Sequence, residues 1–389
     1  AESKITDLIG YLEKKVKALE AQKMKMSAAN QQAYERMASI QIERLQRQLN
    51  PLKAQVDSLH CFFLNEEFQF DIFEYVSSSC VFFTRVIDPQ HSFPSTTLKL
   101  PLNPDNEVFE NIDNAEALRE MSPIPFRYYP EFAIESIINY ITYIIKYTKN
   151  SLQQNSQRLN FFIEFAVVLL RCPELISNPH LKGKLVESLF YGAVPLSKMD
   201  YNPGFMIQSF MTNKGVLGHM LYALLDFYVL VEKTGASSKF YDKFNSRYHT
   251  SVIIEKLLSI EHYRNPLKEY SEKNEHFFIR FVARMLNDTT YLLDESLSEL
   301  SKIHYISEEI DKRTQSGDLE TVVNSEFDGS TFEELNTRLL QSERLAKSFI
   351  GLSTKTIELF DLFTKEVPKA FTKSEIVNRL AGMLDYNLN

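Results

Sequence analysis

The sequence contains no tryptophan, only three cysteines and only 11 glycines in 389 residues. Scarce glycine argues against phosphate-binding loops, tight hairpins and a doubly wound nucleotide fold, because each of these depends on glycine at fixed positions. Cys61, Cys80 and Cys172 include no Cys-x-x-Cys pair, which argues against a zinc signature or a disulfide framework and favours a reducing intracellular compartment. The composition favours an all-α protein.

A global excess of basic residues is also missing. The formal net charge is −8 and the pI is near 5.6, so we expect no nucleic-acid partner. A membrane-spanning helix needs about 20 consecutive apolar residues. The best apolar runs, 161–170 and 220–231, are shorter and contain Glu164 and Asp226. We therefore expect no membrane insertion.

Residues 1–87 are expected to form an N-terminal helical hairpin and its docking helices. Apolar residues recur every three or four positions in two seams, Ile5, Leu8, Leu12, Val16 and Leu19, and Ile42, Leu45, Leu49, Leu52, Val56 and Leu59. An intermolecular coiled coil is the alternative interpretation. Asn50-Pro51 predicts a kink or a new helix within the second seam. The aromatic-rich stretch 61–87 predicts a buried helix pair.

Two segments break the helical pattern. Residues 88–130 carry seven of the 14 prolines, which predicts an irregular insertion, with a functional loop as the alternative. Residues 307–330 are predicted to form an acidic linker. From Ser307 to Glu334 there are nine carboxylates and only two basic residues, typical of a solvated linker or of a docking tail for a basic partner.

The remaining residues predict successive amphipathic helices, in a central stack over 131–306 and a C-terminal group over 331–389. The expected helices are 131–149, 153–171, 179–192, 204–231, 238–260, 274–305, 331–350, 353–366 and 373–388. Thr331 and Glu334 form a capping box. Since one helix pair cannot bury its own apolar face, the pairs must stack. Without a fixed sequence repeat, this predicts an irregular armadillo-like α-solenoid of stacked helix pairs.

Catalytic and metal-binding motifs are absent, and we assign no catalytic, cofactor-binding or metal-binding residue and no cofactor. The Gly215-Val-Leu-Gly218 segment opens an apolar helix and is interpreted as a packing feature. His60-Cys61 is the only adjacent His/Cys pair, but neighbours in a helix point to different sides. Asp288, Asp294 and Glu295 could provide paired carboxylates, although capping, pairing with Arg284 or solvent exposure is the interpretation we prefer. Partner-binding residues remain unassigned.

Several blocks in 130–389 resemble, in order, the core domain of the U-box ubiquitin chain elongation factors, also called ubiquitin conjugation factors. They begin at Tyr129, Asn178, Lys239, Phe281, Phe363 and Glu375, and the most specific contains Asn287-Asp-Thr-Thr290. Residues 1–128 resemble the family only in being helical.

The resemblance implies a ubiquitin-protein transferase that extends polyubiquitin chains on substrates that already carry ubiquitin. In that family a ubiquitin-conjugating enzyme docks on a C-terminal U-box, and the core binds an AAA segregase and ubiquitin-shuttle receptors. It also implies a role in proteasomal and endoplasmic-reticulum-associated degradation, in the cytoplasm and nucleus. Since the sequence stops at Asn389 without a U-box, we expect a non-catalytic fragment. A non-ligase solenoid adaptor for transport or tethering, and an enzyme using His60-Cys61, are the alternatives.

Overall fold

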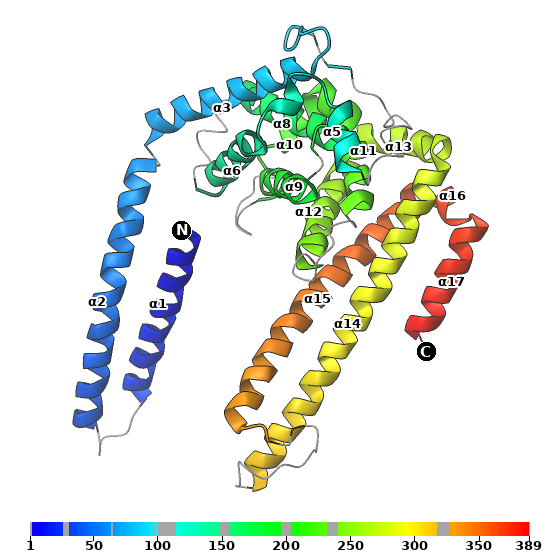
Figure 1. The fold of residues 1–389 in the computed structure, drawn as a ribbon. Helices are drawn as coiled ribbons and strands as arrows, with labels where there is room; N and C mark the ends of the chain where they lie inside the picture. The colour runs from blue at the N-terminus through cyan, green and yellow to red at the C-terminus, as the bar shows by residue number, and fades with distance from the viewer. Residues whose placement is uncertain are drawn as a thin grey trace. The chain divides into compact units, whose positions relative to one another are not determined.

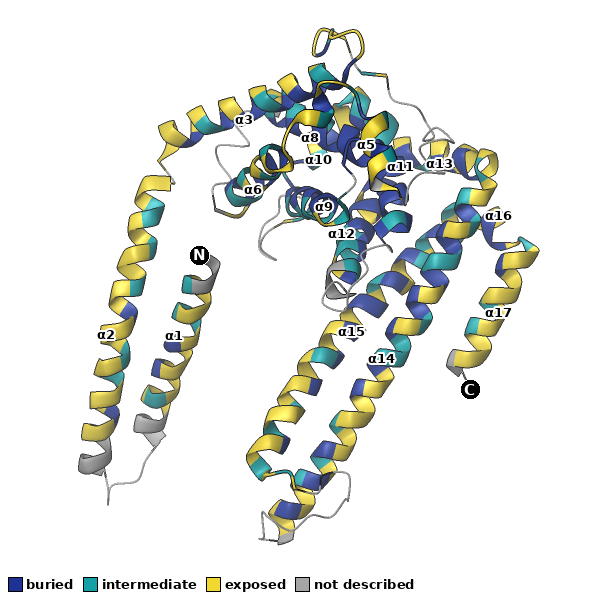
Figure 2. Ribbon diagram, in the orientation of Figure 1, coloured by how far each residue is buried: buried dark blue, intermediate teal, exposed yellow. Residues whose placement is uncertain are grey.

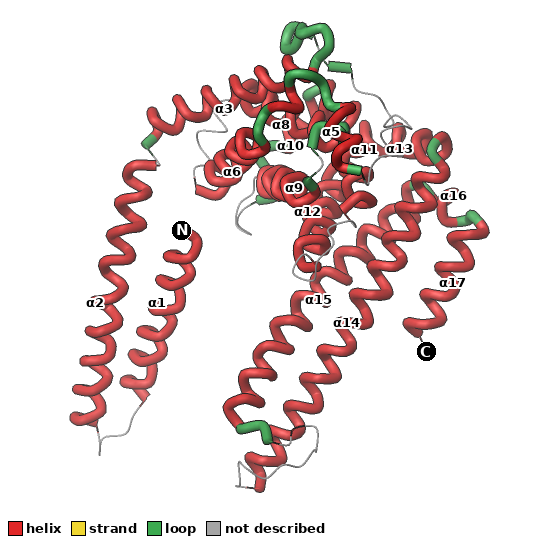
Figure 3. Tube along the Cα trace, in the orientation of Figure 1, coloured by secondary structure: helices red, strands yellow, loops and turns green. Residues whose placement is uncertain are grey.

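The computed structural model describes residues 2–25, 31–63, 65–96, 98–99, 114–147, 156–176, 178–195, 204–231, 240–316, 327 and 329–388. Regular secondary structure in these residues is entirely helical, with no β-strand among them (Figure 3). The all-α prediction is confirmed. The chain divides into two compact units, residues 1–76 with 147–151 and residues 77–146 with 152–389.

The first unit contains a helical hairpin. Its helices are α1 (Glu2–Lys25) and α2 (Gln31–Phe63), which pack side by side and are followed by the start of α3 (Glu66–Ile87) (Figure 1). Leu12 and Leu49 of the predicted seams are buried between them, and Lys53 Nζ lies 2.6 Å from Glu13 Oε1. The predicted N-terminal hairpin is confirmed.

Two predictions for this region are wrong. Of the two outcomes predicted at Asn50-Pro51, the new helix is wrong: Pro51 lies inside α2, which continues to Phe63 without a second start. Contact with α1 continues beyond the proline, where Lys53 pairs with Glu13. Residues 61–87 do not form a buried helix pair. They comprise the end of α2 and one helix, α3, on which Phe73 is buried while Phe68 and Tyr75 are exposed (Figure 2).

The second unit holds most of the helices. In chain order they are α5 (Ala115–Met121), the short 3-10 helix η1 (Phe126–Tyr128), α6 (Glu131–Tyr147), α8 (Ser156–Arg171), α9 (Pro179–Ala193), α10 (Ile207–Thr212), α11 (Lys214–Leu230), α12 (Phe240–Leu258), α13 (Glu261–Lys273), α14 (Glu275–Ser316), α15 (Phe332–Glu366), α16 (Pro368–Phe371) and α17 (Ser374–Leu388). The second half of α3, from Ser77, also belongs to this unit and precedes these helices in the chain.

These helices stack in two layers. Helices α8, α11, α14 and α17 pack in succession as one layer, and α9, α12 and α15 pack in succession as the other. Cross-layer contacts join α8 to α9, α11 to α12 and α14 to α15. Helices α8 and α11 are buried on nearly every side, which explains why their sequences are apolar almost all round (Figure 2). The arrangement is the predicted stack of helix pairs, a solenoid-like fold.

Several helix boundaries differ from the predicted ones, because local hydrogen bonds or packing partners determine where these helices end. The predicted helix 204–231 is two helices, because Asn213 ends α10 and its side-chain oxygen accepts the Val216 N–H at 3.1 Å to begin α11. The predicted helices 331–350 and 353–366 are one helix, α15, whose packing along α14 carries it through Gly351. Helix α13 was not predicted.

The predicted acidic linker begins inside a helix. Helix α14 continues to Ser316, where Arg313 Nε donates to Glu309 Oε1 at 2.7 Å and Arg313 Nη1 donates to the Ser330 carbonyl at 2.8 Å. Both side chains of this ion pair are buried, so 307–316 is the end of a helix with one buried face, while Glu308, Asp311 and Lys312 on it are exposed. Residues 317–326 and 328 lie outside the described part. The Thr331 capping box is present at the start of α15.

The proline-rich segment 88–130 is irregular in part. After α3, the Asp88 carboxylate accepts the backbone N–H groups of Gln90 and Ser92 at 3.0 and 2.8 Å and closes a turn. Residues 97 and 100–113 lie outside the described part. The segment then contains two short helices, α5 and η1, which were not predicted.

Candidate partner-binding groove

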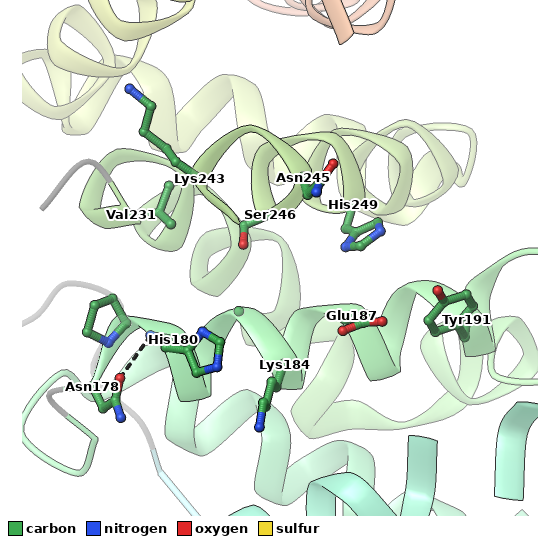
Figure 4. Close-up of a pocket in the computed structure, with 12 residues that line it drawn as sticks. Asn178, His180, Lys184, Glu187, Tyr191, Val231, Lys243, Asn245, Ser246 and His249 are labelled. Atoms are coloured by element: carbon green, nitrogen blue, oxygen red, sulfur yellow. Dashed lines mark hydrogen bonds between the residues drawn. The ribbon is translucent and has the colours of Figure 1, made fainter. Parts of the chain in front are cut away.

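A polar groove lies between α9 and α12, neighbours in one layer of the stack. Lys184, Glu187 and Tyr191 of α9 and Ser246 and His249 of α12 line it, and Figure 4 shows Ser246 and His249 pointing from α12 toward α9, while the Lys184 side chain points away from α12. Its volume is about 390 Å³. The helices approach closely at one point, since a Cβ on Gly183 would lie 3.0 Å from Ser246 Oγ.

Local sequence fixes the helix that carries most of the groove. Asn178 caps α9, its side-chain oxygen accepting the His180 N–H at 3.0 Å, and Pro179 occupies the first helical position. His180, Lys184, Glu187 and Tyr191 then recur every three or four residues, so one face of α9 lines the groove. This polar stripe at helical spacing is the signal that the sequence analysis missed.

The charges that line the groove are paired with neighbouring helices. Lys184 Nζ lies 2.6 Å from Glu135 Oε1 of α6. Lys146 Nζ lies 3.4 Å from Glu187 Oε1 and 4.3 Å from the centroid of the Tyr191 ring. The groove therefore presents polar, aromatic and partly neutralised groups, a surface suited to a polypeptide segment that supplies hydrogen bonds of both kinds.

His249 is the titratable group held most deeply in the groove. Its ring lies 4.3 Å from that of Phe190, centroid to centroid. Burial lowers the pKa of His249, an effect that Glu187 opposes and Lys146 reinforces, so the imidazole is neutral at pH 7. It can donate one hydrogen bond and accept another. None of the three cysteines lines the groove.

The segment that carries the family resemblance most specifically forms buried framework beside α12. Asp288 accepts from Arg247 Nη1 at 2.5 and 2.7 Å, and from the Tyr228 hydroxyl at 3.1 Å. These contacts join α11, α12 and α14. The expectation that Asp288 faces solvent is therefore wrong, since only 5% of the residue is exposed. Asp294, the second carboxylate considered, accepts from the Tyr386 hydroxyl at 3.3 Å and does not converge with Asp288 on a site.

A second buried ion pair joins α8 and α11, which lie in the same layer. Arg171 of α8 donates from Nη1 to Asp226 of α11, and both side chains are almost completely enclosed. Burial lowers the pKa of Arg171, while nearby Tyr270 acts in the opposite direction. Such pairs fix the register of the stacked helices, because either charge alone would be costly inside the stack.

The cysteines have unequal surroundings. Cys61 is exposed on α2, next to His60, and adjacent residues of an α-helix point about 100° apart. Cys80 and Cys172 are buried, and burial raises the pKa of the Cys172 thiol to about 12. Gly215 and Gly218 lie in the first turns of α11, as expected.

The described residues contain neither a cluster of metal ligands nor a helix that could span a membrane. Within them, no three His, Cys, Asp or Glu side chains are grouped as a metal ion would require. No helix among the same residues is long and apolar enough to cross a membrane.

Comparisons with known proteins cover the whole chain. The family model described as ubiquitin elongating factor core matches residues 2–389. The chain is 47% identical over 376 residues to the E4 ubiquitin-protein ligase UFD2 of Saccharomyces cerevisiae, covering 96% of the chain and 38% of that protein. It is 33% identical over 361 residues to ubiquitin conjugation factor E4 of Schizosaccharomyces pombe, covering 90% of the chain and 32% of that protein.

More distant relatives agree. Ubiquitin conjugation factor E4 A of Bos taurus is 27% identical over 278 residues, covering 67% of the chain and 25% of that protein. The chain thus spans about a quarter to two fifths of the length of these relatives. The family match begins at residue 2, so the first 128 residues share the relationship that the sequence analysis assigned only to 130–389. The chain belongs to the ubiquitin elongating factor core family.

Proposed function

We propose that this chain is the partner-binding scaffold of a ubiquitin chain elongation factor, which extends polyubiquitin chains on substrates that already carry ubiquitin. Membership of the ubiquitin elongating factor core family carries this proposal. The two-layer helical stack supports it, because a stack locked by buried ion pairs holds a large surface in one shape.

A scaffold accelerates chain elongation without supplying a reacting group. Holding the ubiquitinated substrate and the charged conjugating enzyme on one framework raises the effective concentration of one for the other. In this proposal the bond-forming chemistry takes place on the conjugating enzyme. Since the chain supplies no reacting group in this proposal, we expect residues 1–389 alone to form no polyubiquitin.

The proposed partners are ubiquitin-conjugating enzymes, acting through a U-box, and ubiquitinated substrates. An AAA segregase and ubiquitin-shuttle receptors are further proposed partners, which would place the protein in proteasomal and endoplasmic-reticulum-associated degradation in the cytoplasm and nucleus. We assign the α9/α12 groove to one polypeptide partner, because its polar stripe and its unionised His249 offer donors and acceptors together.

A chimeric ligase tests the proposal. The matching region of the Saccharomyces cerevisiae relative is replaced by this chain, and polyubiquitin formation is measured with activating enzyme, conjugating enzyme and a monoubiquitinated substrate. We expect the chimera to extend chains and the isolated chain to form none. A folded chimera that is inert with every conjugating enzyme active with the parent ligase would refute the proposal and favour a non-ligase adaptor.

Groove variants then test the assignment of the site. Lys184→Ala and His180→Ala in the chimera are expected to slow chain extension while the thermal unfolding midpoint is kept. Lys365→Ala, which removes an exposed lysine of α15, is the matched control. Equal rates for all three variants would exclude the groove but leave the scaffold function standing.

A further inference from the structure

The junction of α2 and α3 exposes an aromatic cluster. Phe62, Phe63 and Phe68 are 62%, 40% and 37% exposed. Their rings are nevertheless in contact, with centroids 5.0 Å apart for Phe62 and Phe63 and 5.3 Å apart for Phe62 and Phe68. Scattered single apolar residues are normal on a protein surface, but clustered exposed rings mark interaction sites.

Hydrogen bonds fix the shape of this cluster. The Asn65 side-chain oxygen accepts the Phe68 N–H at 3.0 Å at the start of α3. The side-chain amide of Gln69, which is buried, donates to the Phe63 carbonyl at the end of α2. The first hydrogen bond caps the start of α3 and the second ties α3 to the end of α2, so little ordering of these two helix ends remains to be done when a partner binds.

Acidic residues surround the rings. Glu66, Glu67 and Asp71 are exposed, and each lies within three positions of Phe68 along α3. The segment 61–84 contains no lysine and no arginine. Glu66 and Glu67 stabilise the positive end of the α3 dipole, which accounts for two of the carboxylates. Asp71 lies beyond the first turn, so the helix terminus does not account for it.

We propose that this surface, formed by Phe62, Phe63, Phe68, Glu66, Glu67 and Asp71 and named here the acidic aromatic surface, binds a cationic segment of a partner protein that also carries large apolar side chains. The apolar side chains would cover the exposed rings. Lysine or arginine residues would pair with the carboxylates at the rim, where complementary charge mainly sets the association rate and its salt dependence. This proposal is independent of ubiquitin transfer.

A model peptide tests the binding. The probe is a fluorescein-labelled, 18-residue amphipathic peptide of leucine and lysine, and its affinity for the whole chain is measured by fluorescence anisotropy. Phe62→Ser with Phe68→Ser should weaken binding about tenfold or more. Glu67→Lys with Asp71→Lys should weaken binding and flatten its dependence on salt. Met37→Ser, at another exposed position of α2, and Glu20→Lys on α1 are the matched controls and should have little effect.

Cys61 provides a local readout. It is exposed next to Phe62, whereas Cys80 and Cys172 are buried, so a maleimide should label the folded chain at Cys61 alone. Saturating peptide should slow that labelling, and should not slow it in the Phe62→Ser, Phe68→Ser variant.

Three results would overturn the proposal. The first is equal affinity of the probe for the wild type and for the phenylalanine variant. The second is equally tight binding of a peptide in which glutamate replaces every lysine. The third is sedimentation of the wild type as a dimer that the phenylalanine variant abolishes, which would assign the surface to a second copy of the chain.

Discussion

Breaking the buried pair between Arg247 and Asp288 should cost far more stability than breaking an exposed pair of similar geometry. Asp288→Asn keeps the size of the side chain but leaves the Arg247 guanidinium uncompensated, with only 3% of the Arg247 side chain exposed. Removing one partner of a buried pair costs about 3–5 kcal/mol. The Asn side chain would still offer one oxygen to Arg247, so we expect a loss at the lower end of this range.

An exposed pair provides the control. Lys365 Nζ lies 2.5 Å from Asp361 Oδ2 on α15, with the two side chains 68% and 58% exposed. Asp361→Asn should cost less than about 1 kcal/mol, because water already solvates both groups. Urea unfolding is followed by circular dichroism at 222 nm, which reports the helices directly and needs no tryptophan. Losses within about 0.5 kcal/mol of each other for the two variants would refute the reasoning, given the usual scatter between independent sites.

A double variant separates the cost of the unpaired charge from the worth of the pair. Arg247→Met with Asp288→Leu removes both charges, and an apolar replacement of a buried pair is often neutral or stabilising. We therefore expect the double variant to be more stable than Asp288→Asn. A double variant less stable than the single one would show that the Tyr228 and backbone contacts of this network matter more than the charge balance.

Three further predictions concern Lys182, the cysteines and Gly204. Burial lowers the pKa of Lys182 to about 8 from an ordinary 10.5, so between pH 8 and 10.5 the unfolded chain binds more protons than the folded one and stability rises with pH. Lys182→Met should therefore stabilise the protein at pH 7 by about 3 kcal/mol. Urea unfolding at a series of pH values should show this advantage shrinking toward pH 10. Cys61 should react with a maleimide in the native state, and Cys80 should react only after unfolding, because burial shields its thiol and raises its pKa. Mass spectrometry of tryptic peptides locates the label, and prompt labelling of Cys80 in the native state would contradict its burial. Gly204→Ala should destabilise the chain by more than about 1 kcal/mol in thermal melts, because φ is +114° and a Cβ would strike the backbone of Ala193; an unchanged midpoint would argue against that approach.

Helix existence followed from the sequence more reliably than helix boundaries. The apolar residues located α8, α9 and α17 to within a few residues. Periodicity could not locate the break at Asn213, where a single side chain caps a new helix, or the continuity of α2 through Pro51. At Asn213 a local hydrogen bond outweighs the apolar periodicity, and at Pro51 the packing of α2 against α1 does so.

The groove and the ion pairs were harder to predict for a different reason. Arg247 and Asp288 are 41 residues apart, and nothing in either segment alone shows that α12 and α14 bring them together. The groove combines residues from two helices, although the stripe from His180 to Tyr191 was visible as polar positions at helical spacing. The exposed rings of Phe62 and Phe68 were misassigned to a core because aromatic residues are usually buried.

The length of α14 has a mechanical consequence. Its 42 residues correspond to about 63 Å of helix; α11, α13 and α17 contact it, α17 as far along as Asp294, and α15 packs along it toward the far end. The part beyond Asp294 spans about 33 Å, so a tilt of about 10° at that point would swing the distal tip through roughly 6 Å. A small adjustment in the stack would thus be amplified, as by a lever arm, into a displacement of about half the diameter of a helix.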